Sequence, residues 1–308
     1  MLLSRRIKLK NKNLSRELPL HLMILPGLIL ILIFSYGPMA GIIIAFQKFI
    51  PAKGLFGDQK WIGFGNFIYA VQLPGSMRVL WNTFYISFLK MVTGLIVPIT
   101  FAILINEIKN AFIKRSIQTA VYLPHFLSWI ILSGILIDIL SPSNGIVNKI
   151  LGAFGVEPIF FLGDNKWFPI TIVVTHIWKE FGFNTIVYLA AITSIDIQLY
   201  EAAKIDGANR MQQILHVTLP GMSMVIVLLS VLSLGNILNA GFDQIFNLYS
   251  PQVYESGDII DTFVYRIGMM DAQYGVATAI GLFKSVVSFV FIASSYYIAY
   301  KVADYRIF

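Results

Sequence analysis

A polar, mixed-charge stretch from Tyr200 to Gly221 lies between two long apolar runs. Within it the carboxylate of Glu201 stands beside Ala202 and Ala203, whose small side chains leave a low surface around one acid. Such a surface can make a polar or ionic contact in a cleft of another protein. On these features alone, a plain connector between two apolar helices is an equally good interpretation.

The same stretch predicts two short helices at right angles. The first extends over about 197–206 and ends at Gly207, because glycine adopts the left-handed conformation that closes a helix without steric cost. The second begins near Ala208 or Asn209 and is expected to end at Pro220, which lacks the backbone N–H that a helix needs. Its less polar face carries residues at helical spacing: Met211, Ile214, Leu215 and Thr218.

A second group of polar residues lies inside apolar runs, where a polar side chain is costly unless it faces a bundle interior or an aqueous cavity. In the run over 168–192, one helical face and the position beside it carry His176, Lys179, Glu180, Phe183 and Asn184. The next run carries Asn236 and Asn239 at i, i+3, and then Phe242, Asp243, Gln244 and Asn247. These side chains are candidates for lining a path through the membrane.

Each candidate also has a structural interpretation. Lys179 and Glu180 are adjacent, so they point about 100° apart on a helix, and one of them can pair with a neighbouring helix or a second subunit. Asn236 and Asn239 can instead hydrogen-bond between helices. Asp243 is expected near the outer end of its helix, where a carboxylate is less costly.

Two further lysines lie in apolar runs. Lys90 and Lys284 are interpreted as structural or snorkelling groups, and Lys90 is close enough to the outer end of its run for its amine to reach the interface.

Composition places these residues in a membrane. The chain has 308 residues, of which 57% are apolar and 13% charged, whereas soluble globular proteins carry about 25% charged residues. The deficit extends over the whole length, which favours a polytopic membrane protein over a soluble domain with an anchor. The absence of cysteine excludes disulfide frameworks and thiolate chemistry. The net charge of +7 does not indicate nucleic acid, because the basic residues flank the apolar runs.

Six apolar runs are long enough to span a bilayer, and they cover residues 22–46, 84–105, 117–140, 168–192, 222–242 and 276–300. With both termini in the cytoplasm, the inner segments hold 13 lysines and arginines and the outer segments hold 7. This is the positive-inside bias of bacterial cell-membrane proteins. It places the polar stretch at 200–221 on the cytoplasmic side.

These observations predict an all-α polytopic membrane protein with four parts. Residues 1–20 form a basic cytoplasmic segment, and 21–80 contain the first span and an outer loop with an interfacial helix. A five-helix core follows over 81–300, with a cytoplasmic loop at 196–221. Residues 301–308 form a cytoplasmic tail.

The pattern E-A-A, three residues, G, nine residues, V-T-L-P at 201–220 resembles the EAA loop of binding-protein-dependent ABC importer permeases. The family pattern has I-x-L-P at its end, so valine at 217 is one conservative departure. Residues 36–49 (YGPMAGIIIAFQKF), 82–83 and 241–266 resemble the LplB-type polysaccharide permeases. The resemblance therefore covers nearly the whole chain.

The resemblance implies a type I importer permease with the MetI-like (MalF-like) fold. The loop would be the coupling helix that docks on a cytoplasmic ATPase, so that ATPase closure switches the paired permeases between inward- and outward-facing states. The docking contacts implied in this way are Tyr200, Glu201, Ala202, Ala203, Asp206, Gly207, Ala208, Leu219 and Pro220.

The resemblance also implies partners and a cargo. These are a second permease subunit, two copies of the ATPase, an extracytoplasmic solute-binding protein and an oligosaccharide, including complex or uronate-containing glycans. Maltose-type permeases contact their sugar at positions that correspond, by spacing from Glu201, to positions of this chain at or near His176, Glu180, Phe183, Asn236 and Asn239. Amides can bond sugar hydroxyls as donor and acceptor, and aromatic rings can stack on sugar faces.

Two other classes of protein remain as alternatives. An ion-coupled secondary sugar transporter would use Lys179 and Glu180 as coupling groups, but it predicts internal inverted repeats, and none is convincing. A membrane-embedded enzyme is disfavoured because the four histidines lack ligand spacing. The chain has no G-x-x-x-x-G-K-[ST] phosphate loop, so ATP and Mg²⁺ are expected on the partner ATPase, with no catalytic residue, metal or cofactor in this chain.

Overall fold

The computed structural model describes the backbone of residues 2–303 and the side chains of residues 17–297 and 301. Most of this chain is helical, which confirms the all-α class. The sheet found in the described range is a hairpin of two short antiparallel strands, β1 (Gln47–Lys48) and β2 (Lys60–Trp61). The predicted tail at 304–308 and the basic side chains at 5–16 lie outside the described residues.

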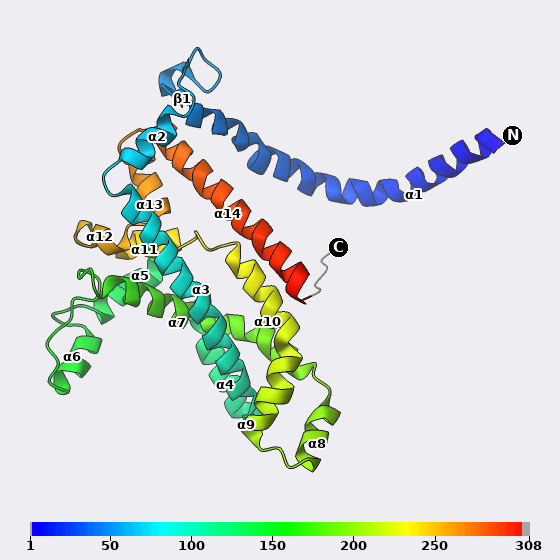
Figure 1. Cartoon of the computed structure of the whole chain (residues 1–308), viewed down its shortest axis with the longest axis vertical. Coiled ribbons are helices and arrows are strands. Elements are labelled where there is room, and N and C mark those ends of the chain that lie inside the picture. The colour runs from blue at the N-terminus through cyan, green and yellow to red at the C-terminus, as the bar shows by residue number, and fades with distance from the viewer. Residues whose placement is uncertain (1, 304–308) are drawn as a thin grey trace.

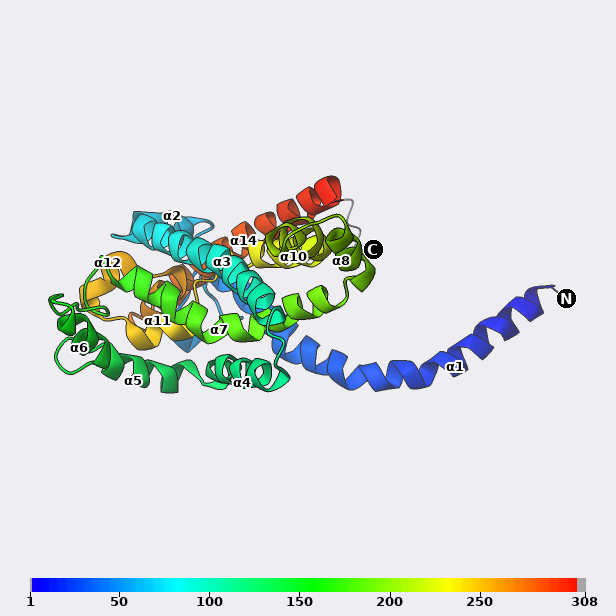
Figure 2. The ribbon, with the colours of Figure 1, turned by 90° about the horizontal axis from the view of Figure 1, so that it is seen from below.

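The first apolar run is helical as predicted. It consists of α1 (Leu2–Ile31), a π-helical turn (Leu32–Tyr36) and a 3₁₀ helix (Gly37–Phe46). Only 6% of its apolar window is buried against the rest of the chain. Figures 1 and 2 show α1, in blue, projecting away from the other helices. Its apolar surface therefore has to be covered by lipid or by another subunit.

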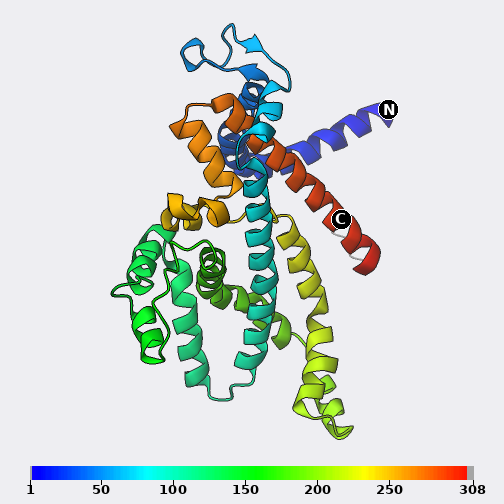
Figure 3. The same ribbon diagram turned by 60° about the vertical axis from the view of Figure 1, so that its left-hand side comes forward.

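Two long helices form the centre of the fold. After the short 3₁₀ turn Pro51–Lys53 and helix α2 (Gly65–Gln72), helix α3 (Ser76–Asn106) packs along α7 (Phe168–Thr193), and both contain the predicted spans. Figure 3 shows α3 as one long continuous helix. The expected interfacial helix at 66–80 is divided between α2 and the start of α3.

The third apolar run is not the single helix that was predicted over 117–140. It contains α4 (Ala111–Tyr122), a 3₁₀ turn (Leu123–Phe126) and α5 (Trp129–Ile139), and the two helices are bent by 106°. Pro124 cannot donate a helical hydrogen bond. Ser128 then starts a new helix, because its side chain accepts a hydrogen bond from the Ile131 N–H at 3.3 Å.

The fifth apolar run differs from prediction at both ends. A continuous helix comprises α9 (Arg210–Gln213), a π-helical turn (Ile214–Thr218) and α10 (Leu219–Leu234). Pro220 therefore does not end the helix that precedes it. The Leu219 N–H bonds to the Ile214 carbonyl five residues earlier, and this wider turn accommodates the proline ring.

At the other end α10 stops at 234, not at 242, and a non-helical segment at 235–241 leads to α11 (Phe242–Leu248). The predicted outer loop up to 274 is largely helical, with a 3₁₀ turn (Pro251–Val253), α12 (Tyr254–Gly257), α13 (Ile260–Tyr265) and a π-helical turn (Arg266–Met270). The last span is α14 (Tyr274–Ala303), as predicted. The outer loop at 142–167 also contains a short helix, α6 (Ile146–Ala153).

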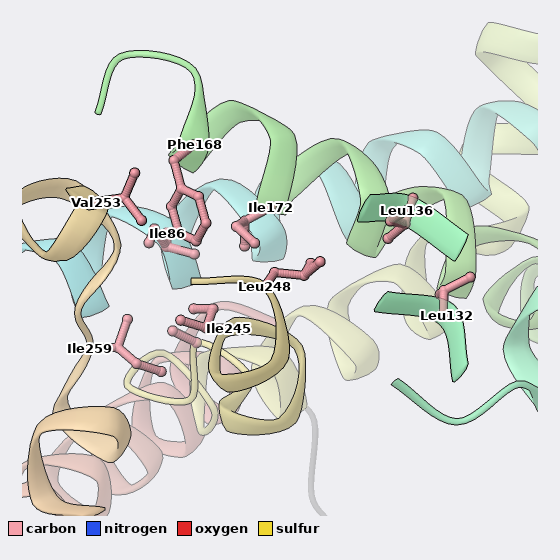
Figure 4. Packing of buried hydrophobic residues seen from close by; sticks show 10 residues of the cluster. Ile86, Leu132, Leu136, Phe168, Ile172, Ile245, Leu248, Val253 and Ile259 are labelled. Atoms are coloured by element: carbon pink, nitrogen blue, oxygen red, sulfur yellow. The ribbon is translucent and has the colours of Figure 1, made fainter. Parts of the chain in front are cut away.

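The largest cluster of buried apolar residues joins α3, α5, α7 and α11, as Figure 4 shows. Phe168 and Ile172 of α7 lie against Ile86 of α3 and Ile245 of α11, and all four are fully buried. Between membrane helices such packing is stabilised mainly by van der Waals contacts, because lipid tails are as apolar as these side chains. This cluster anchors α11 next to the two central helices.

The described part of the chain contains four continuous helical segments that are long and apolar enough to cross a membrane. Two bent pairs, α4 with α5 and α7 with α8 (Ile197–Ile205), raise the number to six if each pair is one span. The β1–β2 hairpin and the α8–α9 region lie at opposite ends of the molecule (Figure 1).

Candidate functional site

The first candidate site is the docking loop, residues 196–221. Helix α8 begins at Asp196, whose side chain accepts a hydrogen bond from the Gln198 N–H at 2.9 Å. It ends at Gly207, whose φ of +78° confirms the predicted left-handed glycine. Asn209 and Gln212 then form a reciprocal capping box that starts α9. Local sequence signals therefore determine both helix ends around this turn.

The predicted docking residues divide into exposed and positioning groups. Glu201, Ala202 and Asp206 are exposed. Tyr200 is half-buried, and its hydroxyl lies 3.0 Å from the hydroxyl of Thr218, which ties α8 to the helix that follows. A hollow of about 270 Å³ separates the two halves of the loop and is lined by Ala203, Asp206, Gly207, Ala208, Gln212, His216 and Val217.

The predicted apolar face of the second helix also contains both exposed and buried side chains. Met211 is 63% and Leu215 51% exposed, whereas Thr218 is buried. Leu219 is half-buried and Pro220 exposed where the loop enters α10. The two large exposed side chains leave an apolar surface on this second helix.

An ion pair that sequence reasoning missed joins the docking loop to α3. Arg210 donates from Nε and Nη2 to the two carboxylate oxygens of Glu107, both at 2.6 Å. Glu107 directly follows the last residue of α3. The two residues are 103 positions apart, so no local pattern indicated the pair. The pair connects the docking loop to the end of α3.

The second candidate site is a cavity of about 390 Å³ between α3, α7 and the 235–241 segment, which we call the central cavity. Its polar lining residues are Ser87, Lys90, His176, Asn184, Ser233, Asn236 and Asn239. Four of these were predicted path residues. Asn236 and Asn239 were expected to share a helical face, and this was wrong. They lie in the non-helical segment, where the Asn239 N–H bonds to the Asn236 carbonyl at 2.8 Å.

The other predicted residues of α7 do not line the central cavity. Lys179, Glu180 and Phe183 contact His125 at the bend between α4 and α5, and we call these four the bend cluster. His125 Nδ1 lies 2.8 Å from Glu180 Oε2. Lys179 donates to the His125 carbonyl at 2.8 Å and to Glu180 Oε1 at 3.1 Å. The His125 ring stacks on Phe183 with centroids 4.0 Å apart. Lys179 and Glu180 therefore pair with a neighbouring helical segment and do not line the central cavity.

Phe242 and Asp243 also lie outside the central cavity. The Phe242 ring stacks on Phe246 and lines a different hollow, next to Tyr265. Asp243 is exposed in the first turn of α11, where its charge favours the helix N-terminus.

The two lysines outside α7 have different environments. Lys284 is paired with Asp261 at 2.6 Å, in agreement with a structural role. Lys90 does not snorkel, because it is only 6% exposed and donates to the Ala240 carbonyl at 2.6 Å and to Gln244 Oε1 at 2.5 Å. Its acceptors are about 150 residues away, so the sequence pattern could not indicate them.

The central cavity can bind a polar solute through amides, hydroxyls, an imidazole and one ammonium group. Within the described residues, no group of three or more His, Cys, Asp or Glu side chains could hold a metal ion. A polar cavity inside a helical membrane protein, with an exposed polar loop at one end, is the arrangement expected of a transport permease.

The chain belongs to the family described as "Binding-protein-dependent transport system inner membrane component", which matches residues 94–304. This membership confirms the predicted resemblance and identifies the chain as a component of the inner membrane. It also disfavours the ion-coupled secondary transporter.

Relatives extend the match over most of the chain. The polygalacturonan/rhamnogalacturonan transport system permease protein YteP of Bacillus subtilis is 40% identical over 289 residues, 94% of this chain and 90% of the relative. Protein LplB of Bacillus subtilis is 40% identical over 288 residues, with the same two coverages. A chain of a bacterial ABC transporter involved in the import of the acidic polysaccharide alginate matches with a TM-score of 0.87 and 40% identity, over 94% of this chain and 98% of that chain. A second structure of the bacterial alginate transporter, in complex with an alginate pentasaccharide-bound periplasmic protein, matches with the same TM-score.

Proposed function

We propose that this chain is the permease subunit of an ATP-driven importer that moves oligosaccharides from an extracytoplasmic binding protein into the cytoplasm by alternating access. The observation that carries the proposal is the exposed docking loop joined to α3 through Glu107 and Arg210. Because α3 also lines the central cavity, a partner that moves the loop can change the cavity.

The proposed assembly contains a second permease, two copies of a cytoplasmic ATPase and the binding protein. In this proposal ATP and Mg²⁺ bind to the ATPase, and this chain has no cofactor of its own and no nucleic-acid partner. Six spans cross the bilayer, with both termini and the docking loop in the cytoplasm. The apolar windows that include α1 and α10 are only 6% and 11% buried within the chain, which supports a lipid environment and a second permease as their cover.

We infer that the cargo includes acidic oligosaccharides. Among the proteins named above, YteP is a polygalacturonan/rhamnogalacturonan permease and the solved transporter is involved in the import of alginate, and these polymers carry uronate carboxylates. The central cavity has amides for hydroxyl groups and an ammonium group for a carboxylate.

Copurification and uptake test this function. Purification of the tagged chain from native membranes is expected to recover an ATPase and a second permease. In proteoliposomes the assembly should take up oligosaccharide only when the binding protein and ATP are both supplied. Uptake driven by an ion gradient without ATP would contradict the proposal.

We expect Glu201→Lys to uncouple transport. Glu201 is exposed on α8, so the reversed charge leaves folding intact but places a cation where the ATPase groove is expected to contact a carboxylate. Loss of a charged hydrogen bond costs about 1.5–3 kcal/mol, so ATP-dependent uptake should fall more than about tenfold.

Glu201→Gln is the matched control and should retain more activity, because it keeps the shape and an acceptor oxygen. Both variants should still be recovered in the membrane in normal amounts. Normal uptake by Glu201→Lys would show that Glu201 does not contribute to docking on the ATPase.

A further inference from the structure

The ammonium group of Lys90 has an unusual environment for a buried cation. Its side chain is only 6% exposed, and its two protein acceptors are both neutral, the Ala240 carbonyl and the Gln244 side-chain amide. Among the described residues, no carboxylate oxygen lies within 4.0 Å of Nζ. The ammonium group is therefore not directly paired with a carboxylate of the described chain, although a buried charge is costly unless it is paired and fully hydrogen-bonded.

Lys90 is also one of the residues that line the central cavity. An ammonium group has three N–H donors, and the two acceptors above account for two of them. The third donor remains for a group inside the cavity. The volume of about 390 Å³ falls within the range of roughly 300–1,000 Å³ that is usual for ligand sites.

The surrounding residues hold the ammonium group in place. Gln244 donates from Nε2 to the Ile172 carbonyl at 2.8 Å and to the Thr175 hydroxyl at 2.9 Å, which turns its oxygen toward Lys90. Gly241 has a φ of +89°, and a Cβ at this position would lie 3.2 Å from Lys90 Nζ. A cation held by neighbours in this way can bind an anion without first being ordered.

The other polar groups of the cavity suit a sugar. Asn184, Asn236 and Asn239 each carry an amide that can accept from and donate to hydroxyl groups. A hexuronate presents hydroxyl groups and one carboxylate on the same ring. The cavity therefore has the donors and acceptors for both kinds of group, with the single cation on α3.

We propose that Lys90 is a specificity-determining residue that binds the carboxylate of an acidic sugar in the central cavity. This inference rests on the proposed transport function and assigns the charged contact to a residue of α3, outside the path residues of α7 and the 235–241 segment.

Binding to the detergent-solubilised assembly, without the binding protein, tests the proposal. The probes are trigalacturonate, trimannuronate and the carboxyl-reduced, neutral form of each. The wild type should bind the better acidic probe at least about tenfold more tightly than its neutral form, because charged hydrogen bonds are the stronger ones. Lys90→Gln keeps a donor for Ala240 but removes the charge, so this preference should fall to near one while affinity for the neutral probe is kept.

Two controls separate recognition from structure. Lys90→Arg keeps the charge and should retain most of the preference. Lys284→Gln removes the same charge from a lysine that is paired with Asp261 outside the cavity, and the preference should not change. If Lys90→Gln weakens acidic and neutral probes equally, Lys90 only positions the 235–241 segment and the proposal is wrong.

Uptake by the wild type distinguishes failure of the transport function from failure of the Lys90 assignment. If ATP-dependent oligosaccharide uptake occurs but neither acidic probe is preferred, the transport function stands and the assignment of Lys90 falls. If the complete assembly imports no oligosaccharide, the transport function fails and the assignment falls with it.

Discussion

Gly207→Val is expected to reduce ATP-dependent uptake strongly while the chain still inserts and assembles. Gly207 has a φ of +78°, and a Cβ there would meet nothing within 4 Å, so the effect is purely conformational. A left-handed conformation costs an L-residue about 1–2 kcal/mol, and more for a β-branched one. The Tyr200–Thr218 contact and the cap at Asn209 hold the loop on both sides, so relief of this strain would have to reorient Glu201.

The measurements are uptake and ATPase stimulation by the loaded binding protein, made on the same reconstituted assembly. Uptake should fall by about 5–30-fold, the factor that corresponds to 1–2 kcal/mol. Gly207→Asn is the matched control, because asparagine tolerates the left-handed region, and it should retain most of the uptake. Equal uptake by the valine and asparagine variants would show that the turn is not needed for coupling.

The docking loop was predictable because its determinants are local. A glycine after one short helix and an asparagine with a glutamine three residues later specify two helix ends. These signals lie within a few residues of the structures they form. Among the predicted helix ends, the one at Pro220 was wrong, because a π-helical turn that the pattern does not indicate lets the helix continue.

The interior was less predictable because its determinants are distant in the sequence. Apolar composition continues from α10 to Phe242, but the helix stops at 234. The segment that follows is fixed by Lys90, which binds the Ala240 carbonyl, and by the left-handed Gly241. Likewise, helical spacing placed Lys179 and His176 on one face, whereas His125 from another span determines which of them faces the cavity.

Helix α3 connects the two candidate sites. Glu107, just after its end, binds the docking loop, and Lys90, within it, lines the central cavity. Glu107 follows Lys90 by 17 positions, which corresponds to about 26 Å along the helix at 1.5 Å per residue. We therefore expect movement of the docking loop to reach the cavity through α3 as well as through α7 and α10, which flank the loop and also line the cavity.

Gly182→Ala is expected to disrupt folding of the permease. Gly182 lies in the middle of α7, and a Cβ there would come within 2.1 Å of the Val121 carbonyl oxygen in the last turn of α4. Because that neighbour is backbone, α4 and α7 would have to move apart. His125 follows α4 by three residues, so the displacement would pull it away from Lys179 and Glu180. Overpacking costs about 1–3 kcal/mol, and loss of the hydrogen bond from the Lys179 ammonium group to the His125 carbonyl costs about 1.5–3 kcal/mol.

The expected loss of about 3 kcal/mol or more is a large part of the usual 5–15 kcal/mol of folding stability, so thermal denaturation of the purified assembly should occur at a clearly lower temperature, with a lower yield. Gly134→Ala in α5 is the matched control, because a Cβ there meets nothing within 4 Å and alanine favours a helix by roughly 0.5–1 kcal/mol over glycine. That variant should be at least as stable as the wild type. Equal stability of the two alanine variants would contradict this prediction. It would show that the close approach of α4 to α7 does not stabilise the bend between α4 and α5.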